Sequence, residues 1–353
     1  MIVLGIESSC DETAAAVVQD GSILHSNVVA SSMNLHVAYG GVVPEIAARS
    51  HIEAIMPVID QALDEAKMGW DDIDAIAVTY GAGLGGSLLI GVLSARTLAI
   101  TKGKPLYAIN HVEGHVYANF LTQTSLPGYV LPAEQPEFPL LALIVSGGHS
   151  QLALFRGHFD YTLLGQTQDD AVGEAFDKVA KIIGLPYPGG PSVGKKALEG
   201  DAHAFELPKA KMTGKYDFSF SGLKTAVLRT AQAAVGADFT LPSKDLPERL
   251  NEAQKADLAA SFQRVAIETV VDKAMLAFEE FSPKSVVIAG GVAASPELRR
   301  QLSERLPIPI AYTDFKLCTD NGAMIAALGC FTAMAGRPTA DPYTLDIAPN
   351  LSM

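Results

Sequence analysis

The sequence is poor in cysteine and in positive charge, and each shortage excludes a class of protein. Its 353 residues include only three cysteines, Cys10, Cys318 and Cys330. So few cysteines exclude a disulfide framework and fit a reducing compartment. The formal net charge of −13 argues against a general nucleic-acid-binding protein, because neutralising phosphates requires clustered lysine and arginine.

Long apolar runs are also missing. The most apolar helical stretch, Leu88–Ile100, is shorter than the roughly 20 residues that a membrane span needs, and it carries Arg96. The amino terminus has no basic region and no small-residue cleavage site, which are the marks of a signal peptide. We therefore expect a soluble, cytoplasmic protein with no membrane segment.

Length and composition predict two folded domains. A chain of 353 residues has room for two domains of about 100–200 residues each, and 48% hydrophobic residues are enough for buried cores. Apolar strand patterns alternate with helical patterns in both halves, which predicts an α/β fold. We expect an N-terminal lobe at 1–125, completed by a C-terminal helix at 323–345. A proline-rich connection at 126–139 would lead to a C-terminal lobe at 140–322.

Both predicted lobes contain a strand–turn–strand unit with small polar residues in the turn, which is a weak internal repeat. The predicted strands are Ile2–Ile6, Ala14–Val18, Leu140–Val145 and Gln151–Phe155.

Proline guides three further predictions. A helix begins at Pro44, where a missing N–H costs nothing, and Pro57 interrupts it. Pro186–Pro191 forms a turn, and Pro309–Thr313 forms the last strand.

The pair His111 and His115 is the first candidate for chemistry. Spaced four residues apart at the start of a helix, both imidazoles can reach one metal ion. At least one more ligand must come from elsewhere, and carboxylates are the usual completion. Chance spacing is the alternative. A zinc peptidase would need its glutamate next to the first histidine, whereas Glu113 lies in the middle and projects to another side.

Glycine-rich turns are the second candidate. Gly81–Gly86 follows a strand and opens a helix, where backbone N–H groups bind an anion or simply allow tight packing. It is not a dinucleotide fingerprint, because no acid follows about 20 residues later. Gly147 and Gly148 beside Ser146 favour a phosphate-facing loop. At Gly290-Gly291 the backbone carries no side chains, which would suit the base or ribose of a nucleotide lying against it.

Acidic residues and one basic segment complete the candidates. Asp11 and Glu12 lie in the first polar turn, Asp177 lies within a helix, and Asp320 opens a helix, where an aspartate usually acts as N-cap. The segment Lys195–Arg229 holds seven basic and four acidic residues, with aromatic residues between them. In so acidic a chain it is the best candidate for contact with a polyanion.

Together these motifs resemble the TsaD family, whose archaeal and eukaryotic relatives are subunits of the KEOPS complex. The resemblance spans Ile2 to about Ala335. It rests on Glu7–Thr13, Gly40–Glu45, the glycine turn with Gly83, His111–His115, Val145–His149, Tyr187–Pro191, Phe218–Lys224, Gly290–Val292 and Asp320–Gly322.

The resemblance implies a fold and an activity. The fold would be the two-lobed α/β actin, sugar-kinase and heat-shock-chaperone superfold (ASKHA), with a nucleotide cleft between the lobes. The enzyme would transfer a threonylcarbamoyl group from threonylcarbamoyl-AMP to the exocyclic amine of adenosine 37 in tRNAs that read ANN codons, releasing AMP. A metal-dependent glycoprotein endopeptidase, once ascribed to this family, and a non-catalytic scaffold paralogue are the alternatives.

The resemblance also implies site residues and partners. His111, His115 and Asp320 would hold one divalent metal ion per subunit, with Fe²⁺ favoured and Zn²⁺ or Mg²⁺ as alternatives. Asp11 and Glu12 match acids that the family requires. TsaB-like and TsaE-like proteins would be partners. The residues implied to contact the adenylate are Ile144, Val145, Ser146, Gly147, Gly148, Asp177, Gly190 and Ser295.

Two positions depart from the family pattern. Many members carry asparagine where this chain has Ser295, and the loop Gly81-Ala82-Gly83 often reads Gly-Pro-Gly.

Overall fold

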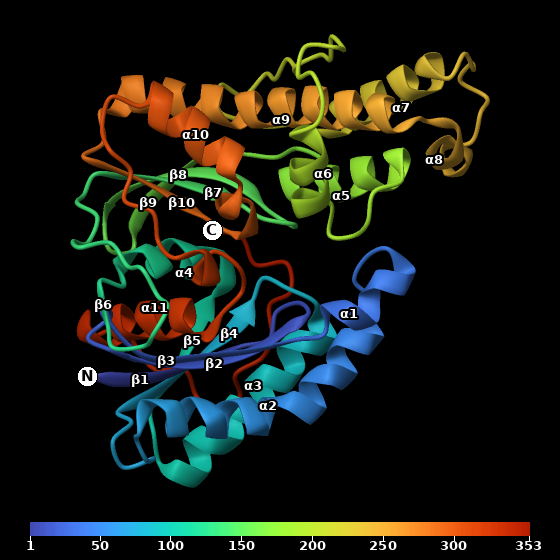
Figure 1. Ribbon diagram of the computed structural model, residues 1–353. Helices are drawn as coiled ribbons and strands as arrows, with labels where there is room; N and C mark the ends of the chain where they lie inside the picture. The colour runs from blue at the N-terminus through green and yellow to red at the C-terminus, as the bar shows by residue number, and fades with distance from the viewer. The chain divides into compact units, whose positions relative to one another are not determined.

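The computed structural model describes residues 1–353, which divide into two compact units (Figure 1). Unit 1 consists of Met1–Glu137 and Ala311–Met353, and unit 2 of Phe138–Ile310. Almost all of the proline-rich segment therefore lies in unit 1. Residues 311–322, which we had expected in the C-terminal lobe, also belong to unit 1. No helix is both long enough and apolar enough to cross a membrane.

Unit 1 is built on a six-stranded sheet with the order β5-β4-β1-β2-β3-β6. The strands β1, β2 and β3 are antiparallel neighbours, while β4 and β5 extend the sheet in parallel. The strands are β1 Ile2–Glu7, β2 Glu12–Gln19, β3 Ile23–Ser31, β4 Ala75–Gly81, β5 Leu106–Asn110 and β6 Gln123–Thr124.

The helices of unit 1 cover both faces of this sheet (Figure 1). Side chains alternate along β1, so Leu4 and Ile6 join the core that α2 and α3 cover, while Gly5 faces α11. The helices are α1 Met33–His36, α2 Pro44–Ala66, α3 Gly85–Lys102, α4 His111–Tyr117 and α11 Gly322–Met334. The short 3-10 turns are η1 Val37–Tyr39, η2 Ala118–Phe120 and η5 Phe315–Leu317.

Unit 2 carries a four-stranded sheet with the order β10-β7-β8-β9, in which only the β7–β10 pair is parallel. The long helix α9 packs against α6, α5, α7 and α10. The elements are β7 Leu140–Val145, β8 Ser150–Gly157, β9 Asp160–Gln166, α5 Val172–Ile183, α6 Gly189–Ala197, α7 Ser221–Ala234, η3 Ser243–Asp245, α8 Leu246–Arg249, α9 Glu252–Phe281, β10 Ser285–Ala289, η4 Gly291–Ala294 and α10 Pro296–Arg305.

The α/β fold, both strand–turn–strand units and the helix start at Pro44 are as predicted. The interruption at Pro57 and the strand at 309–313 were wrong, and the turn at Pro186–Pro191 is correct only for its first half. Pro57 lies inside the continuous helix α2. Pro57 has no N–H to donate to the Glu53 carbonyl, but both residues face solvent. Buried side chains on both sides of Pro57 hold the helix to the sheet. The expected turn at Pro186–Pro191 already contains the start of α6, since Pro191 falls in the first helical turn. Residues 309–313 form no strand, because they carry the chain from unit 2 to unit 1 without a strand partner.

Candidate functional site

Three predicted metal ligands lie together in unit 1. Asp320 Oδ1 is 3.2 Å from His115 Nε2 and 3.5 Å from His111 Nε2. One ligand atom from each of the three side chains lies within 4.8 Å of the others. Donors held about 2.1 Å from one metal ion at right or tetrahedral angles are roughly 3.0–3.4 Å apart. The two distances from Asp320 are therefore close to those expected between donors that share one metal ion.

Local sequence places these side chains. Asn110 ends β5 and caps α4, since its side chain accepts hydrogen bonds from the backbone N–H groups of Val112 and Glu113. The cap starts the helix at His111, and the four-residue spacing brings His115 to the same face.

Asp320 lies two residues before the start of α11, and it is not that helix's N-cap. Asn321 takes the capping role by accepting from the N–H of Met324, which leaves the Asp320 carboxylate for other partners. The helix packs directly on the sheet, because a side chain at Gly322 would lie 2.5 Å from the backbone of Ala15. Close packing thus fixes the start of α11 beside α4.

Glu7 was not among the sequence candidates, yet it orients His111. This fully buried carboxylate lies 3.1 Å from His111 Nδ1, and Ser9 Oγ lies at the same distance. Glu7 also accepts from the backbone N–H of Ser9 and from the Thr79 hydroxyl. A carboxylate on Nδ1–H selects the tautomer that leaves Nε2 free for a metal ion. The available signal was a charged residue at the end of a buried strand.

His115 supplies the test of whether a metal fits. Its side chain is 1% exposed, and neither ring nitrogen has a hydrogen-bond partner. Nε2 is close to Asp320, but not in hydrogen-bonding geometry. A buried unpartnered polar atom costs about 1–3 kcal/mol. A divalent ion bound to Nε2 removes that cost for this atom, so the donor set fits a metal.

The charges around the cluster also favour a cation. Burial, together with the charges of Asp320 and Asp11, raises the pKa of Glu12 to about 9. Although burial lowers the pKa of His111, Glu7 and Asp320 outweigh it and raise this pKa to about 9. Neighbouring carboxylates contribute to both shifts, and a bound cation would reduce this repulsion.

Glu113, the base that a peptidase would need, does not contact the metal-ligand cluster. Burial raises its pKa to about 7, against the opposing charge of Arg337, and its Oε1 atom has no hydrogen-bond partner. It makes no ion pair with either histidine. The geometry therefore gives no support to the peptidase alternative.

The adenylate-contacting residues implied by the resemblance all lie in unit 2. The turn after β7 is closed by hydrogen bonds between Ser146 and His149, and side chains added at Gly147 or Gly148 would enter open space. Gly290, with φ of 88°, approaches Val145 so closely that a side chain there would lie 2.5 Å from the Val145 carbonyl oxygen. The parallel pair β7–β10 thus brings two glycine turns together.

Two helix starts of unit 2 contain the other implied contacts, which are Asp177, Gly190 and Ser295. Asp177 Oδ1 accepts from the N–H of Gly189 at 2.6 Å, which fixes the first turn of α6 next to Gly190. Burial raises the pKa of Asp177. Ser295 caps α10, accepting from the N–H of Leu298 at 3.4 Å.

Comparison with known proteins identifies the family. The family model described as "TsaD: tRNA N6-adenosine threonylcarbamoyltransferase" matches residues 23–327. The chain belongs to the TsaD family. A relative from Thermomicrobium roseum is 51% identical over 343 residues, covering 95% of this chain and 93% of the relative. One from Dehalococcoides mccartyi is 46% identical over 353 residues, covering 100% and 99%. Both are named tRNA N6-adenosine threonylcarbamoyltransferase.

Solved structures agree on the fold. Full-length HypF in its phosphate- and nucleotide-bound form has a TM-score of 0.56 at 13% identity, covering 95% of this chain and 46% of HypF. Component A of (R)-2-hydroxyglutaryl-CoA dehydratase from Acidaminococcus fermentans has a TM-score of 0.50 at 16% identity, covering 95% and 99%. These likenesses show that the TsaD chain has the actin, sugar-kinase and heat-shock-chaperone fold.

The glycine turn at 81–86 serves packing in this TsaD chain. The N–H of Gly83 donates to Pro349, and the N–H of Leu84 donates to Ser9. A side chain at Gly83 would lie 2.6 Å from the Ser9 carbonyl oxygen. Of the two alternatives that the sequence left open, the structure favours close packing over anion binding.

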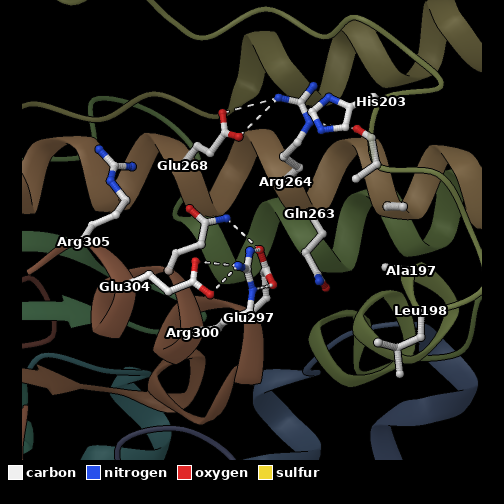
Figure 2. Close-up of a pocket in the computed structure, with 13 residues that line it drawn as sticks. Ala197, Leu198, His203, Gln263, Arg264, Glu268, Glu297, Arg300, Glu304 and Arg305 are labelled. Atoms are coloured by element: carbon white, nitrogen blue, oxygen red, sulfur yellow. Dashed lines mark hydrogen bonds and ion pairs between the residues drawn. The ribbon is translucent and has the colours of Figure 1, made fainter.

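A pocket of about 470 Å³ in unit 2 contains none of the predicted substrate contacts (Figure 2). It is lined by parts of α6, α9 and α10. Its arginines are already paired, because Arg264 reaches Glu268 and Arg300 lies between Glu297 and Glu304. These ion pairs neutralise the charge that an anionic ligand would need.

The basic segment Lys195–Arg229 is also largely neutralised. Lys209, for example, pairs with Glu268 and Asp272 of α9, at 2.9 and 2.7 Å. The paired cations are Lys196, Lys209, Lys215 and Lys224. Lys195 and Lys211 are exposed and lack ion pairs. Most of the positive charge that suggested a polyanion contact is therefore used within unit 2.

Proposed function

We propose that this chain transfers the threonylcarbamoyl group of threonylcarbamoyl-AMP to the exocyclic amine of adenosine 37 in tRNAs that read ANN codons, releasing AMP. The observation that carries the proposal is 46–51% identity, over nearly the whole chain, to curated relatives named for this transfer. The metal-ligand cluster supports it further, because a non-catalytic paralogue has no need of those side chains.

In this proposal His111, His115 and Asp320 hold one divalent metal. Two imidazoles and a carboxylate suit Fe²⁺, which is stable in a reducing cytoplasm, with Zn²⁺ and Mg²⁺ as alternatives. When bound, the metal supplies Lewis-acid stabilisation of substrate oxygens. Glu7 holds the His111 ring with Nε2 directed to the metal position.

The AMP part of the substrate is assigned to unit 2. The Ile144–Gly148 turn offers open backbone for phosphate, and Asp177 holds the α6 start at Gly190. The Ser295 hydroxyl already caps α10, so we assign it a role in placing the helix start rather than a strong side-chain bond to the nucleotide.

The reaction is acyl transfer to an amine. The N6 nitrogen of adenosine 37 attacks the carbamoyl carbon, the bond from that carbon to the phosphate oxygen breaks, and AMP leaves. Asp11 or Glu12 accepts the proton released by the amine. The substrate is already activated, so positioning and charge stabilisation supply most of the acceleration.

We propose that TsaB-like and TsaE-like proteins assist with tRNA in the cytoplasm. The chain has a net charge of −13, and most cations of its one basic segment are paired internally. Binding tRNA requires unpaired cations, so part of the basic surface comes from partners.

The test combines the purified metal-loaded chain, TsaB and TsaE proteins, threonylcarbamoyl-AMP and unmodified tRNA. Mass spectrometry of the digested tRNA should detect threonylcarbamoyladenosine. A parallel incubation with sialoglycoprotein, with and without chelator, should give no cleavage. Glycoprotein cleavage that the chelator stops, without tRNA modification, would establish the peptidase alternative.

A further inference from the structure

His51 is a buried polar residue that none of the roles above uses. Its side chain lies on α2 and is fully buried. Nε2 is 3.0 Å from the Cys10 carbonyl oxygen, and Nδ1 is 2.7 Å from the Thr13 hydroxyl. A carbonyl only accepts, so Nε2 carries the proton and Nδ1 accepts from Thr13. Burial also lowers the pKa of His51, which keeps the ring neutral.

The same carbonyl receives a second hydrogen bond from α3. Ser87 Oγ donates to the Cys10 carbonyl at 3.0 Å, and the Ser87 carbonyl accepts from Ser8 Oγ at 3.0 Å. Two helices that cover one face of the sheet are thereby tied to the turn that joins β1 to β2.

The residues that His51 contacts flank the two acids. Asp11 and Glu12 lie between Cys10 and Thr13, so His51 holds the backbone carbonyl immediately before them and the side-chain hydroxyl immediately after them. A misplacement of 1 Å in a reacting group can cost about 100-fold in rate. The two bonds therefore matter to where the carboxylates point as well as to stability.

We propose that His51 is a positioning residue for the transfer: by holding the Cys10 carbonyl and the Thr13 hydroxyl, it fixes the direction of the Asp11 and Glu12 carboxylates. This inference rests on the proposed function. His51 touches no substrate in this role and acts only through the turn.

Two substitutions separate the bonds. In His51→Gln the side-chain amide reaches the position of Nε2 and still donates to the Cys10 carbonyl. In His51→Asn the shorter amide reaches only the position of Nδ1, so the bond to Cys10 is lost. We expect His51→Asn to lower kcat by about 10- to 100-fold, with metal content and the KM for tRNA unchanged. His51→Gln should recover most of the rate.

The matched control is His25→Asn. His25 is a half-buried histidine on β3 whose Nε2 bonds to Gln19, and it has no contact with the turn. Its replacement should leave kcat unchanged. The proposal is overturned if kcat is unchanged in His51→Asn, if His51→Gln loses as much as His51→Asn, or if the loss of rate follows a loss of metal or of folded protein.

A readout without activity distinguishes this inference from the proposed function. Nitrogen-15 NMR of the wild-type chain at neutral pH should show His51 as the neutral tautomer with hydrogen on Nε2. Amide hydrogen exchange at Glu12 and Thr13 should accelerate in His51→Asn but not in His25→Asn. A wild-type chain that modifies no tRNA contradicts the proposed function, whereas the opposite tautomer or unchanged exchange contradicts the positioning role.

Discussion

Replacing Glu7 by glutamine should weaken metal binding without unfolding the protein. Glu7 accepts three hydrogen bonds, from the backbone N–H of Ser9, the hydroxyl of Thr79 and Nδ1 of His111. Glutamine offers one oxygen in place of two and adds an N–H₂ group, from which neither the Ser9 N–H nor the His111 Nδ1–H can accept. At least one of the three bonds must therefore be lost.

The size of the effect follows from those contacts. A hydrogen bond to a charged group is worth about 1.5–3 kcal/mol, and loss of the group that orients a metal-bound histidine lowers metal affinity about 10- to 100-fold. That range corresponds to about 1.4–2.7 kcal/mol. We expect the dissociation constant of the Glu7→Gln variant to rise by this factor.

The assay is titration of metal-stripped protein with Zn²⁺ against a chromophoric chelator, with circular dichroism to confirm folding. Glu113→Gln is the matched control, because Glu113 is partly buried and lies between the two histidines in sequence, but pairs with neither. Its metal affinity should stay at the wild-type value. Unchanged affinity in Glu7→Gln, or an equal loss in both variants, would refute the role given to Glu7.

Four further outcomes are expected. Asp11→Asn or Glu12→Gln should abolish single-turnover transfer while metal content is retained; full transfer by both variants would exclude these acids as the base. Chelation should stop transfer, and Fe²⁺ or Zn²⁺ should restore it, as measured by mass spectrometry of the tRNA. Burial lowers the pKa of His51 in the folded protein, so below about pH 6.5 the unfolded chain binds a proton at His51 more readily than the folded chain does. The melting temperature should therefore fall between pH 8 and pH 5.5, and it should fall less in His51→Gln. Burial and the charges of Asp11 and Asp320 raise the pKa of the Cys10 thiol, so Cys10→Ala should keep its transfer rate, and Cys10 should react slowly with thiol reagents at neutral pH.

The metal cluster shows how far sequence reasoning reached. The spacing of His111 and His115 predicts a shared helix face, because helical geometry is local. Asp320 came from the family resemblance, since an aspartate before a helix usually reads as its cap. The structure gives the cap to Asn321 instead. Telling the roles of Asp320 and Asn321 apart requires the three-dimensional contacts of each side chain.

Glu7 and His51 were missed because their partners are distant in sequence. Glu7 meets His111 across 104 residues and Thr79 across 72, and His51 meets Cys10 across 41. No local pattern encodes these contacts. The prediction that the basic segment contacts a polyanion is weakened for the same reason, because the acids that neutralise its lysines come mainly from the distant helix α9.

Helix α2 shows a different limit. Proline has a local cost that sequence reasoning treats as an interruption at Pro57. In the structure, buried side chains such as Ile55 and Ile59 hold both sides of the helix to the sheet, and tertiary packing outweighs the lost hydrogen bond.

The transfer itself is tested most directly with threonylcarbamoyl-AMP labelled with carbon-13 at the carbamoyl carbon. The metal-loaded chain and its partners would receive either an ANN-reading tRNA with adenosine at position 37 or the same tRNA with inosine there, which lacks the exocyclic amine. We expect label on adenosine 37, with one AMP released for each group transferred, and no label on the inosine tRNA. Unlabelled tRNA in both reactions, or equal labelling of both tRNAs, would contradict it.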